Sequence, residues 1–436
     1  MNAREAAVKI LFKLDRDNAY VNKALADELK NNLFTDVDKG FITEIVMGCV
    51  KNRELLDFYI MQFSKVKIRK MSVQVRNILE AGAYQIMFLD KVPDSAACNE
   101  SVKLARKYAS RSSGFINGIL RNLSRNKSAV KQPDKSGDKV KYLSVRYSYP
   151  VWLTEMLTEQ YGLETCELIH DAANKSYNPM IRANRLKSDC CTGGELDKDK
   201  FIGILKRDGI EVCADSEIDV CFHVKGKLDI NSSAAYKAGY YTLQNRSSQL
   251  AVIALNPKPG EFIIDMCAAP GGKTTAAAER MNNTGKILAF DIHEHKIELI
   301  DKAAKRLGID IIKPELKDAA VFDERYAGAA DRVFVDAPCS GFGVIHTKPD
   351  IKRHRKPEDI EELVQIQSRI LDTASKYVKP GGVLVYSTCT ILKQENEMQI
   401  KNFLNTHSEF NLDYERTLLT HVEGGSGFYI ARLIKH

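Results

Sequence analysis

The stretch FIIDMCAAPGGKT, residues 262–274, runs from a short apolar segment through two adjacent glycines into the start of a helical pattern. Gly271 and Gly272 permit a tight turn there and the close approach of a ligand to the backbone. Apolar runs of strand length and helical patterns then alternate as far as residue 433. This alternation predicts an α/β domain on a mainly parallel, doubly wound sheet, with ligands bound where strands end.

The spacing of apolar residues also predicts where the elements of this domain lie. Helices are expected at residues 273–280, 296–307 and 358–378. Strands are expected at residues 262–266, 286–291, 309–313, 332–336 and 383–388, and residues 428–433 can add an edge strand.

The chain before this domain has a different pattern. Residues 3–127 show helical spacing and contain no proline before Pro93, so they predict an all-helical domain. A polar stretch at 127–139 is the expected linker. A helix near 150–161 and a strand, helix and strand between 180 and 224 predict a small α+β module. The expected domains are 1–130 (helical), 131–235 (linker and small module) and 236–436 (α/β).

Composition limits the class of protein. The chain has 436 residues, of which 44% are hydrophobic and 28% charged, as in globular proteins with several domains. It contains no run of about 18 apolar residues, so no membrane span or membrane partner is expected. The first five residues include Glu5 and begin no apolar segment, which indicates a cytoplasmic, reducing location.

Positive charge is concentrated in the first domain. Residues 1–130 hold 22 Lys and Arg against 14 Asp and Glu, whereas the remainder holds 42 against 43. A basic domain joined to a nearly neutral one is typical of a protein that binds a polyanion with the first and processes it with the second. The alternative is a basic face that only aids solubility.

Two of the ten cysteines follow apolar strands directly. Cys339 follows the run at 333–335, and Cys389 follows the run at 383–385. The other cysteines form no C-x-x-C pair, so we expect buried apolar residues and no metal site. Two soft nucleophiles at two strand ends suggest a reaction that needs a thiolate, and a second thiol to complete it.

The glycine turn favours one of three cofactor classes. A P-loop would need a glycine where Cys267 stands, and the dinucleotide motif G-x-G-x-x-G is absent. S-adenosylmethionine has no phosphate, and acidic residues on successive strands suit its ribose, adenine and cationic methionine end. Asp291 can accept hydrogen bonds from the ribose. Asp318 can accept one from the adenine amine, or it is a surface aspartate.

A methyl acceptor that requires a thiolate is C5 of a pyrimidine. Addition of the thiolate to C6 raises the electron density at C5, which then takes the methyl group, and a base removes the C5 proton. Asp336, three residues before Cys339, can hydrogen-bond to N3 of the ring during this addition. The base must be single-stranded or flipped out to reach such a pocket.

Three segments carry a resemblance to a known family. Residues 265–274, 336–341 and 386–390 are similar to signature motifs of the NOL1/NOP2/Sun family of RNA cytosine-5 methyltransferases, which have a Rossmann-like catalytic domain. The helical domain resembles the NusB transcription-antitermination fold, best at 99–105 and 114–120. This combination is typical of family members that methylate 16S ribosomal RNA, so the resemblance implies that substrate. We also expect a monomer.

The resemblance also implies roles that the residues alone left open between the two cysteines. Cys389 is the implied nucleophile, and Cys339 assists release of the product. Lys273 lies close to the target base, with Asp336 beside the thiols. The cofactor contacts implied for S-adenosylmethionine are Cys267, Ala268, Ala269, Pro270, Gly271, Gly272, Lys273, Asp291, Asp318 and Asp336.

Three stretches leave alternatives open. Residues 317–319 lack the glycine that usually precedes Asp318 in the family. Residues 351–356 are basic where relatives often place a tryptophan, which predicts an RNA-facing loop or a solvated turn. Residues 140–149 mix tyrosines with basic residues, which suits stacking on bases or a linker helix that packs its tyrosines.

Other functions compete with methylation of 16S rRNA. The same chemistry could act on tRNA or on another rRNA cytidine, because loops and the helical domain select the RNA. A non-catalytic RNA-binding or antitermination factor would explain the basic domain but not the two cysteines. A P-loop ATPase would explain residues 272–274 but not Cys267.

Overall fold

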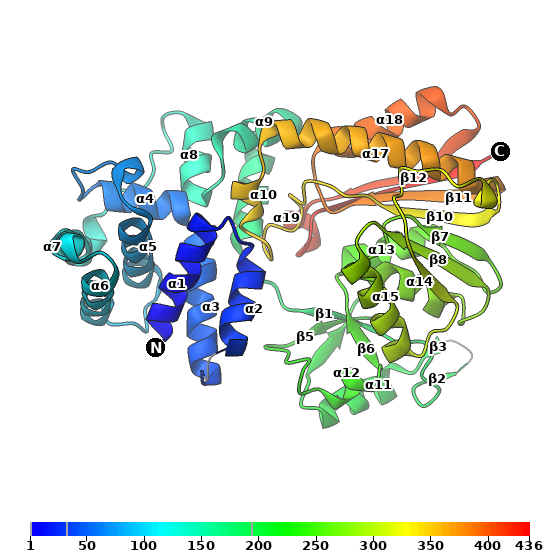
Figure 1. Cartoon of the computed structure of the whole chain (residues 1–436), viewed down its shortest axis with the longest axis horizontal. Helices are drawn as coiled ribbons and strands as arrows, with labels where there is room; N and C mark the ends of the chain where they lie inside the picture. Colours follow the sequence, from blue (N-terminus) through cyan, green and yellow to red (C-terminus); the bar gives the residue numbers. More distant parts are fainter. Residues whose placement is uncertain (1, 32–33, 193–194) are drawn as a thin grey trace. The chain divides into compact units, whose positions relative to one another are not determined.

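The computed structural model describes residues 2–31, 34–192 and 195–436, which form two compact units. The first holds the described residues up to Asn174 together with Ile345–Lys356 (Figure 1). The second holds Lys175–Val344 and Pro357–His436. The boundaries of these two units differ from the boundaries of the three expected domains. No helix in the described ranges has both the length and the apolar character that a membrane crossing requires.

The first unit is helical, and its central helix is α5 (Val73–Phe88), most of whose residues are buried. Two glycines let helices approach closely: a Cβ at Gly48 would lie 1.9 Å from the Tyr84 ring, and one at Gly82 would lie 2.6 Å from Leu120. The expected helical character of 3–127 and the helix at 150–161 are confirmed. The remaining helices here are α1 (Ala3–Arg16), α2 (Val21–Asn31), α3 (Asp36–Lys51), α4 (Arg53–Met61), α6 (Asp94–Tyr108), α7 (Ser113–Arg125), α8 (Lys139–Tyr147), α9 (Val151–Tyr161) and α10 (Leu163–Asn174), with the 3-10 turns η1 (Ile68–Lys70), η2 (Ser110–Ser112) and η3 (Lys127–Ala129).

The basic stretch 351–356 belongs to this helical unit through the short helix α16 (Ile351–His354). Lys352 is buried, donates to two backbone carbonyl oxygens at 3.1 and 3.3 Å, and lies over the ring of Tyr149, itself buried. The Nη2 of Arg353 lies 2.7 Å from Oδ1 of Asp15 in α1, with which it forms an ion pair. The expectation of an RNA-facing loop is therefore wrong for Lys352, because intramolecular partners take its donors. Tyr149 supports the packing interpretation of 140–149.

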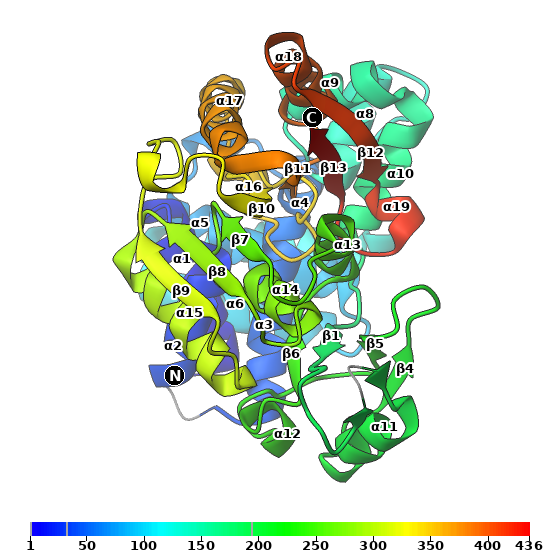
Figure 2. The ribbon, with the colours of Figure 1, turned by 90° about the vertical axis from the view of Figure 1, so that its right-hand side faces the viewer.

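The second unit contains a seven-stranded sheet in the order β12-β13-β11-β10-β7-β8-β9 (Figure 2). Strands β7 to β11 run parallel, and β13 is antiparallel to both of its neighbours. The expected Rossmann-like α/β fold is confirmed. The strands are β7 (Phe262–Asp265), β8 (Lys286–Asp291), β9 (Ile312–Leu316), β10 (Ala330–Asp336), β11 (Val378–Thr388), β12 (Phe410–Leu418) and β13 (Phe428–Lys435).

Helices cover both faces of this sheet (Figure 1, Figure 2). Because side chains alternate along a strand, Phe334 packs with α13, α14 and α15, whereas its neighbours Val333 and Val335 pack with α17 and α18. The helices are α13 (Arg246–Leu255), α14 (Gly272–Arg280), α15 (Glu294–Leu307), α17 (Pro357–Tyr377), α18 (Glu397–Thr406) and α19 (Thr420–Glu423), with the 3-10 turns η4 (Glu324–Tyr326) and η5 (Lys393–Glu395).

Two expectations about this sheet are wrong. The strand expected at 309–313 is β9, which begins three residues later. The strand expected at the edge, β13, lies inside the sheet, and β12 forms the edge. We missed β12 because most of its residues are exposed and polar, so they form no apolar run. An exposed, charged outer strand is what protects a sheet edge from further pairing.

The predicted small α+β module is present in the second unit and has its own buried core. Its sheet has the antiparallel order β4-β5-β1-β6. Its elements are β1 (Met180–Ala183), β2 (Cys191–Thr192), β3 (Glu195–Leu196), α11 (Lys198–Arg207), β4 (Val212–Ala214), β5 (Cys221–Val224), α12 (Ala234–Lys237) and β6 (Tyr241–Leu243).

Candidate active site

The turn between β7 and α14 contains two glycines, and the structure explains each of them differently. Gly271 has φ +97°, and a Cβ there would lie 3.2 Å from the backbone of Ile300 in α15. A side chain is therefore excluded by conformation and by packing. A Cβ at Gly272 would meet only the Nε2 of Gln244, at 3.7 Å. Protein packing leaves space beside Gly272, and a ligand of the loop can use it.

Acidic residues lie at the carboxyl ends of successive strands, as expected. Asp265 is buried at the end of β7, and burial raises its pKa to about 7. Its Oδ2 accepts from the Thr274 hydroxyl at 2.7 Å, and the backbone N–H of Cys267 also acts on this carboxylate and opposes the effect of burial on its pKa. Asp291, at the end of β8, is buried and accepts from a backbone N–H at 3.1 Å. Asp318 follows β9 and is exposed.

The register of the sheet brings the two cysteines together. Asp336 of β10 pairs with Ser387 of β11, so the turns after both strands start side by side. Cys339 and Cys389 then lie with their Sγ atoms 3.3 Å apart, and both are partly exposed. Six of the other cysteines are buried, as expected for small apolar residues.

A lysine and an aspartate border the two thiols. The Nζ of Lys273 lies 2.6 Å from Oδ2 of Asp336, whose Oδ1 accepts from the Ser387 hydroxyl at 2.9 Å. Burial opposes the charge of Lys273, but Asp336, Cys389 and Asp265 outweigh burial and raise its pKa. The ion pair between Lys273 and Asp336 therefore joins the predicted cofactor loop, residues 267–273, to both cysteine turns.

The two thiols do not have the same surroundings. The hydrogen bond with Cys389, burial and the nearby charges of Glu395 and Asp336 raise the pKa of Cys339 well above its usual range. The attraction to Lys273 acts on Cys389 instead. Two like-charged thiolates at this distance repel each other, so one proton is retained by the pair.

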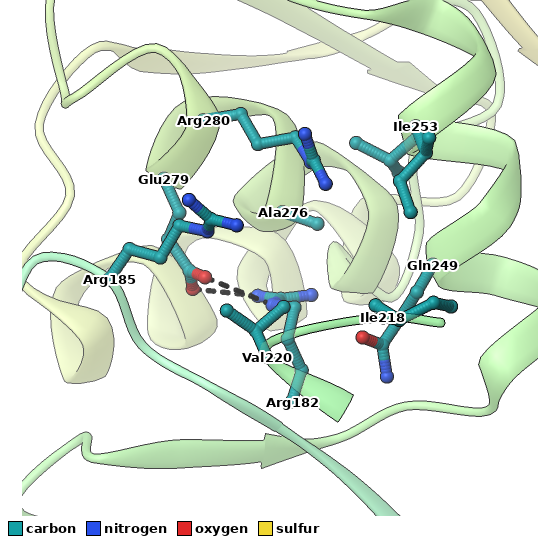
Figure 3. Close-up of a pocket in the computed structure, with 10 residues that line it drawn as sticks. Arg182, Arg185, Ile218, Val220, Gln249, Ile253, Ala276, Glu279 and Arg280 are labelled. Atoms are coloured by element: carbon teal, nitrogen blue, oxygen red, sulfur yellow. Dashed lines mark hydrogen bonds and ion pairs between the residues drawn. The ribbon is translucent and has the colours of Figure 1, made fainter. Parts of the chain in front are cut away.

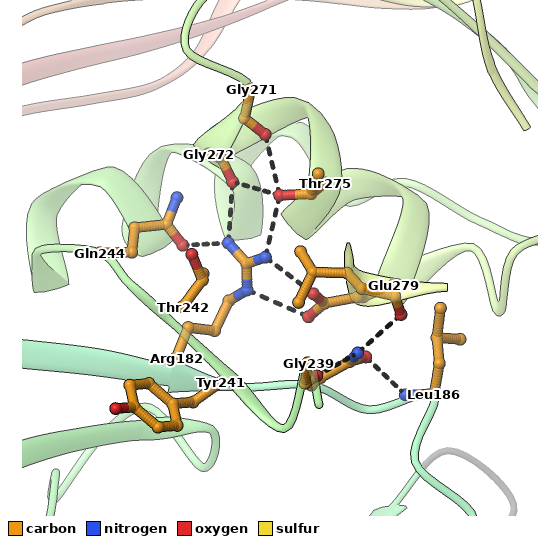
Figure 4. Close-up of polar contacts among 12 residues, drawn as sticks. Arg182, Leu186, Gly239, Tyr241, Thr242, Gln244, Gly271, Gly272, Thr275 and Glu279 are labelled. Carbon is orange, nitrogen blue, oxygen red and sulfur yellow. Dashed lines mark hydrogen bonds and ion pairs between the residues drawn. The ribbon is translucent and has the colours of Figure 1, made fainter. Parts of the chain in front are cut away.

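Sequence reasoning missed the residue that holds the cofactor loop from outside the catalytic domain. Arg182 of β1 donates to Glu279 at 2.7 and 3.0 Å, to Thr275 at 3.1 Å and to the Gly272 carbonyl at 2.8 Å (Figure 4). It also donates to Oε1 of Gln244. No motif in residues 180–184 signals this role, because the partners lie about 90 residues away.

These contacts decide the orientation of the Gln244 amide. Its oxygen accepts from Arg182, so its nitrogen points the other way, where Nε2 is buried and has no hydrogen-bond partner among the described residues. Arg182 also lines a small cavity together with Arg185, Glu279 and Arg280 (Figure 3). A buried amide donor beside the cofactor loop is a group that a polar ligand can satisfy.

One group of possible metal ligands lies elsewhere in the small module. Asp215, Cys221 and His223 bring their ligand atoms within 4.8 Å of one another. Asp215 already accepts from His223 at 3.0 Å and lies 3.3 Å from the Nε of Arg246. The guanidinium supplies the positive charge that a cation would bring, so we interpret this group as an ion-pair network.

Comparison with known proteins agrees with this geometry. The family model "16S rRNA methyltransferase RsmB/F" matches residues 252–434, and the NusB family model matches residues 1–125. The "Probable ribosomal RNA small subunit methyltransferase B" of Bacillus subtilis is 36% identical and covers 100% of this chain and 99% of that protein. The corresponding protein of Proteus mirabilis is 30% identical, again with 100% and 99% covered.

Solved structures extend the comparison. The crystal structure of PH0851 has a TM-score of 0.80 at 29% identity and covers 100% of this chain and 99% of that one. A methyltransferase homolog protein from Pyrococcus horikoshii has a TM-score of 0.60 at 28% identity and covers 69% of this chain and all of that one. The fold is therefore that of an S-adenosylmethionine-dependent methyltransferase. Within that class, the chain belongs to the RsmB family of ribosomal RNA small subunit methyltransferases, with its NusB domain.

Proposed function

We propose that this chain transfers the methyl group of S-adenosylmethionine to C5 of a cytidine in 16S ribosomal RNA. The observation that carries the proposal is the pair of thiols 3.3 Å apart, bordered by Lys273 and Asp336. An oxygen or nitrogen acceptor would need no thiol, whereas C5 needs a nucleophile at C6. The names of the family and of its relatives support small-subunit rRNA as the substrate.

The residues at the cofactor loop fit S-adenosylmethionine. There is space beside Gly272, and the buried Nε2 of Gln244 next to it has no hydrogen-bond partner among the described residues, so a polar ligand can occupy this place. Asp291 would bind the ribose, and Asp318 the adenine amine. The remaining loop contacts would come from residues 267–273. When bound, the cofactor supplies an electrophilic methyl group.

The side chains of this chain would then divide the chemistry on the base. The Cys389 thiolate adds to C6, and the new S–C bond makes C5 nucleophilic. Asp336, held by Lys273 and Ser387, hydrogen-bonds to the ring edge during this addition. After C5 is methylated, a base removes the C5 proton and the electron pair expels the Cys389 thiolate. Cys339 assists this elimination.

The different surroundings of the two thiols support this assignment. Lys273 attracts charge on Cys389, while Glu395 and Asp336 disfavour charge on Cys339. The attacking thiol, Cys389, must be a thiolate. Cys339, which assists release, needs a proton that it can keep or exchange. The family resemblance and the electrostatics therefore favour the same nucleophile.

The RNA would be bound mainly outside the catalytic sheet. We propose that the helical domain, 1–130, binds rRNA through its excess of positive charge, and that the module within 131–235 helps to bind it. We propose that the enzyme acts as a monomer in the cytoplasm. Binding that weakens steeply with added salt is the expected signature of phosphate contacts.

Bisulfite sequencing of RNA treated with the purified chain and S-adenosylmethionine tests the proposal. A single protected cytidine in 16S rRNA is the expected result. Protection only in tRNA or 23S rRNA would move the chemistry to another RNA. Binding of RNA with no methylation, and no heat on titration with S-adenosylmethionine, would favour a non-catalytic RNA-binding factor.

A further inference from the structure

A buried carboxylate lies next to the two cysteine turns. Glu395, in η5, is fully buried. Its Oε2 accepts from the backbone N–H of Ser340 at 2.8 Å, and its Oε1 accepts from the Ser340 hydroxyl at 2.5 Å. Ser340 directly follows Cys339, so Glu395 holds the turn that carries that thiol.

The same network reaches the turn of the other cysteine. The Ser340 hydroxyl lies 2.8 Å from the hydroxyl of Thr390, which directly follows Cys389. The backbone carbonyl of Cys389 also accepts from the N–H of Gly343 at 2.9 Å. A Cβ at Gly343 would lie 2.8 Å from that carbonyl oxygen, so the two turns are in close contact. Glu395 is thus linked to both cysteine turns within two hydrogen bonds.

The donors around Glu395 indicate its ionisation state. The Nε2 of Gln367 donates to Glu395 at 2.9 Å and to the carbonyl of Pro338 at 3.0 Å, and this carbonyl fixes the orientation of the Gln367 amide. The groups that contact the carboxyl oxygens are therefore two fixed N–H donors, from Ser340 and Gln367, and the hydroxyls of Ser340 and Thr390. Burial raises the pKa of Glu395, while the bonds from Ser340 and Gln367 act against burial. A protonated carboxyl would lack an acceptor for its proton at Oε2.

We propose that Glu395 is a positioning residue of the active site, which joins the two cysteine turns and whose negative charge keeps the shared proton on Cys339. The thiolate of the pair is then Cys389, beside Lys273. This proposal deepens the proposed function and rests on it for its catalytic meaning. The charged groups that act on the thiol pair are Lys273 from α14, Asp336 from β10 and Glu395 from η5, and Asp265 from β7 acts on Lys273.

The charge of Glu395 is tested by Glu395→Gln, which keeps the size of the side chain. The amide oxygen can still accept at the Oε2 position, and the amide nitrogen can donate to the Ser340 hydroxyl after this hydroxyl turns. Peptide mass spectrometry then gives the initial rates of alkylation by iodoacetamide at Cys339 and Cys389. We expect the ratio of the Cys389 rate to the Cys339 rate to fall about tenfold, the effect of one pKa unit.

The matched control is Glu397→Gln, the same change two residues along the chain. Glu397 contacts the hydroxyl of Thr417 at 2.5 Å, away from the cysteine turns. This variant should leave the ratio of alkylation rates within about twofold of the unchanged chain. A Glu395→Gln ratio equal to that of the control, in a protein with an unchanged circular dichroism spectrum, would overturn the role of the charge.

The link between the turns is tested by Ser340→Ala, which keeps the charge of Glu395 and the Ser340 N–H. Diamide oxidises two neighbouring thiols to a disulfide and itself takes up the two electrons and two protons. We expect slower formation of the Cys339–Cys389 disulfide in Ser340→Ala, by about threefold to tenfold, because the loosened turns hold the sulfur atoms less often in bonding geometry. An unchanged rate would overturn the positioning role.

Neither measurement depends on methylation of RNA. If the chain failed to methylate any RNA but Glu395→Gln still changed the alkylation ratio, the proposed function would fall and the effect on the thiol pair would remain. If Glu395→Gln did not fold, Ser340→Ala would decide the positioning role. The unchanged chain would decide the role of the charge, because alkylation of Cys339 at least as fast as that of Cys389 would overturn it. In an active enzyme, Glu395→Gln and Ser340→Ala should both transfer methyl groups more slowly than the unchanged chain. The rate should rise with pH in both variants, and the two pH profiles should differ.

Discussion

The two cysteine turns look alike in sequence and differ in their surroundings. Each follows an apolar strand, and the register of β10 and β11 brings their sulfur atoms to 3.3 Å. Cys389 has Lys273 nearby, whereas the turn of Cys339 is bound to the carboxylate of Glu395. The difference teaches that two equivalent nucleophiles become distinct through the charges next to them.

The largest expected effect is that of Cys389→Ala, which removes the proposed nucleophile. The rate of methyl transfer should fall by about 10⁴-fold or more, because the thiolate that adds to C6 is lost and the neighbouring Cys339 keeps its proton. Transfer of tritium from labelled S-adenosylmethionine to 16S rRNA measures this loss. Cys213→Ala, at an exposed cysteine far along the sequence, is the control and should keep full activity.

Cys339→Ala should have the second largest effect and a different character. Release of the product should slow about 1,000-fold, because elimination loses the thiol that assists it. The covalent protein–RNA complex should then accumulate and migrate as a shifted band on a denaturing gel. Full turnover with no shifted band would show that the two cysteines do not divide the reaction.

Lys273→Met should reduce methyl transfer about 100-fold, because the thiolate of Cys389 and the carboxylate of Asp336 lose their cation. Alkylation of Cys389 at pH 7 should slow as well, because its proton is then held more tightly. Lys302→Met is the control, since Lys302 is paired only with a carboxylate on the surface of α15. Equal alkylation in both variants would contradict the electrostatic difference between the two turns.

The smallest effect is expected for Ser387→Ala. This change removes one hydrogen bond to Asp336 and leaves the ion pair with Lys273, so methyl transfer should fall about fivefold to tenfold. Steady-state kinetics with 16S rRNA measure it. Ser375→Ala, whose hydroxyl bonds to a carbonyl within α17, should change the rate by less than about twofold.

The catalytic sheet was predictable because its elements are local. Strands β7, β8, β10 and β11 are apolar runs, and the helices between them have clear periodicity. β12 was missed because an exposed edge strand needs no apolar run. Lys352 was misjudged because a basic stretch usually faces solvent, and only the folded chain shows the carbonyl oxygens that bind it.

The residues of the candidate site also divide into those that the sequence predicted and those that only the structure revealed. Residues 267–273, Asp291, Asp336 and both cysteines were predicted as site residues from their positions at strand ends. Glu395 and Arg182 were not found, because their partners lie about 55 and 90 residues away in sequence. A buried charge carries no local signal, since its function depends on the donors that folding gathers around it.

The sequence by itself determined the class of fold, the glycine turn, the strand-end carboxylates and the two thiols, because these depend on local pattern and short motifs. Only the tertiary structure decided that the thiols touch, that Lys273 and Asp336 form an ion pair beside them, and that Glu395 lies against the Cys339 turn. The physical reason is that electrostatic interactions act through space. A charge changes the proton of a thiol according to their separation in the folded chain and the water excluded between them.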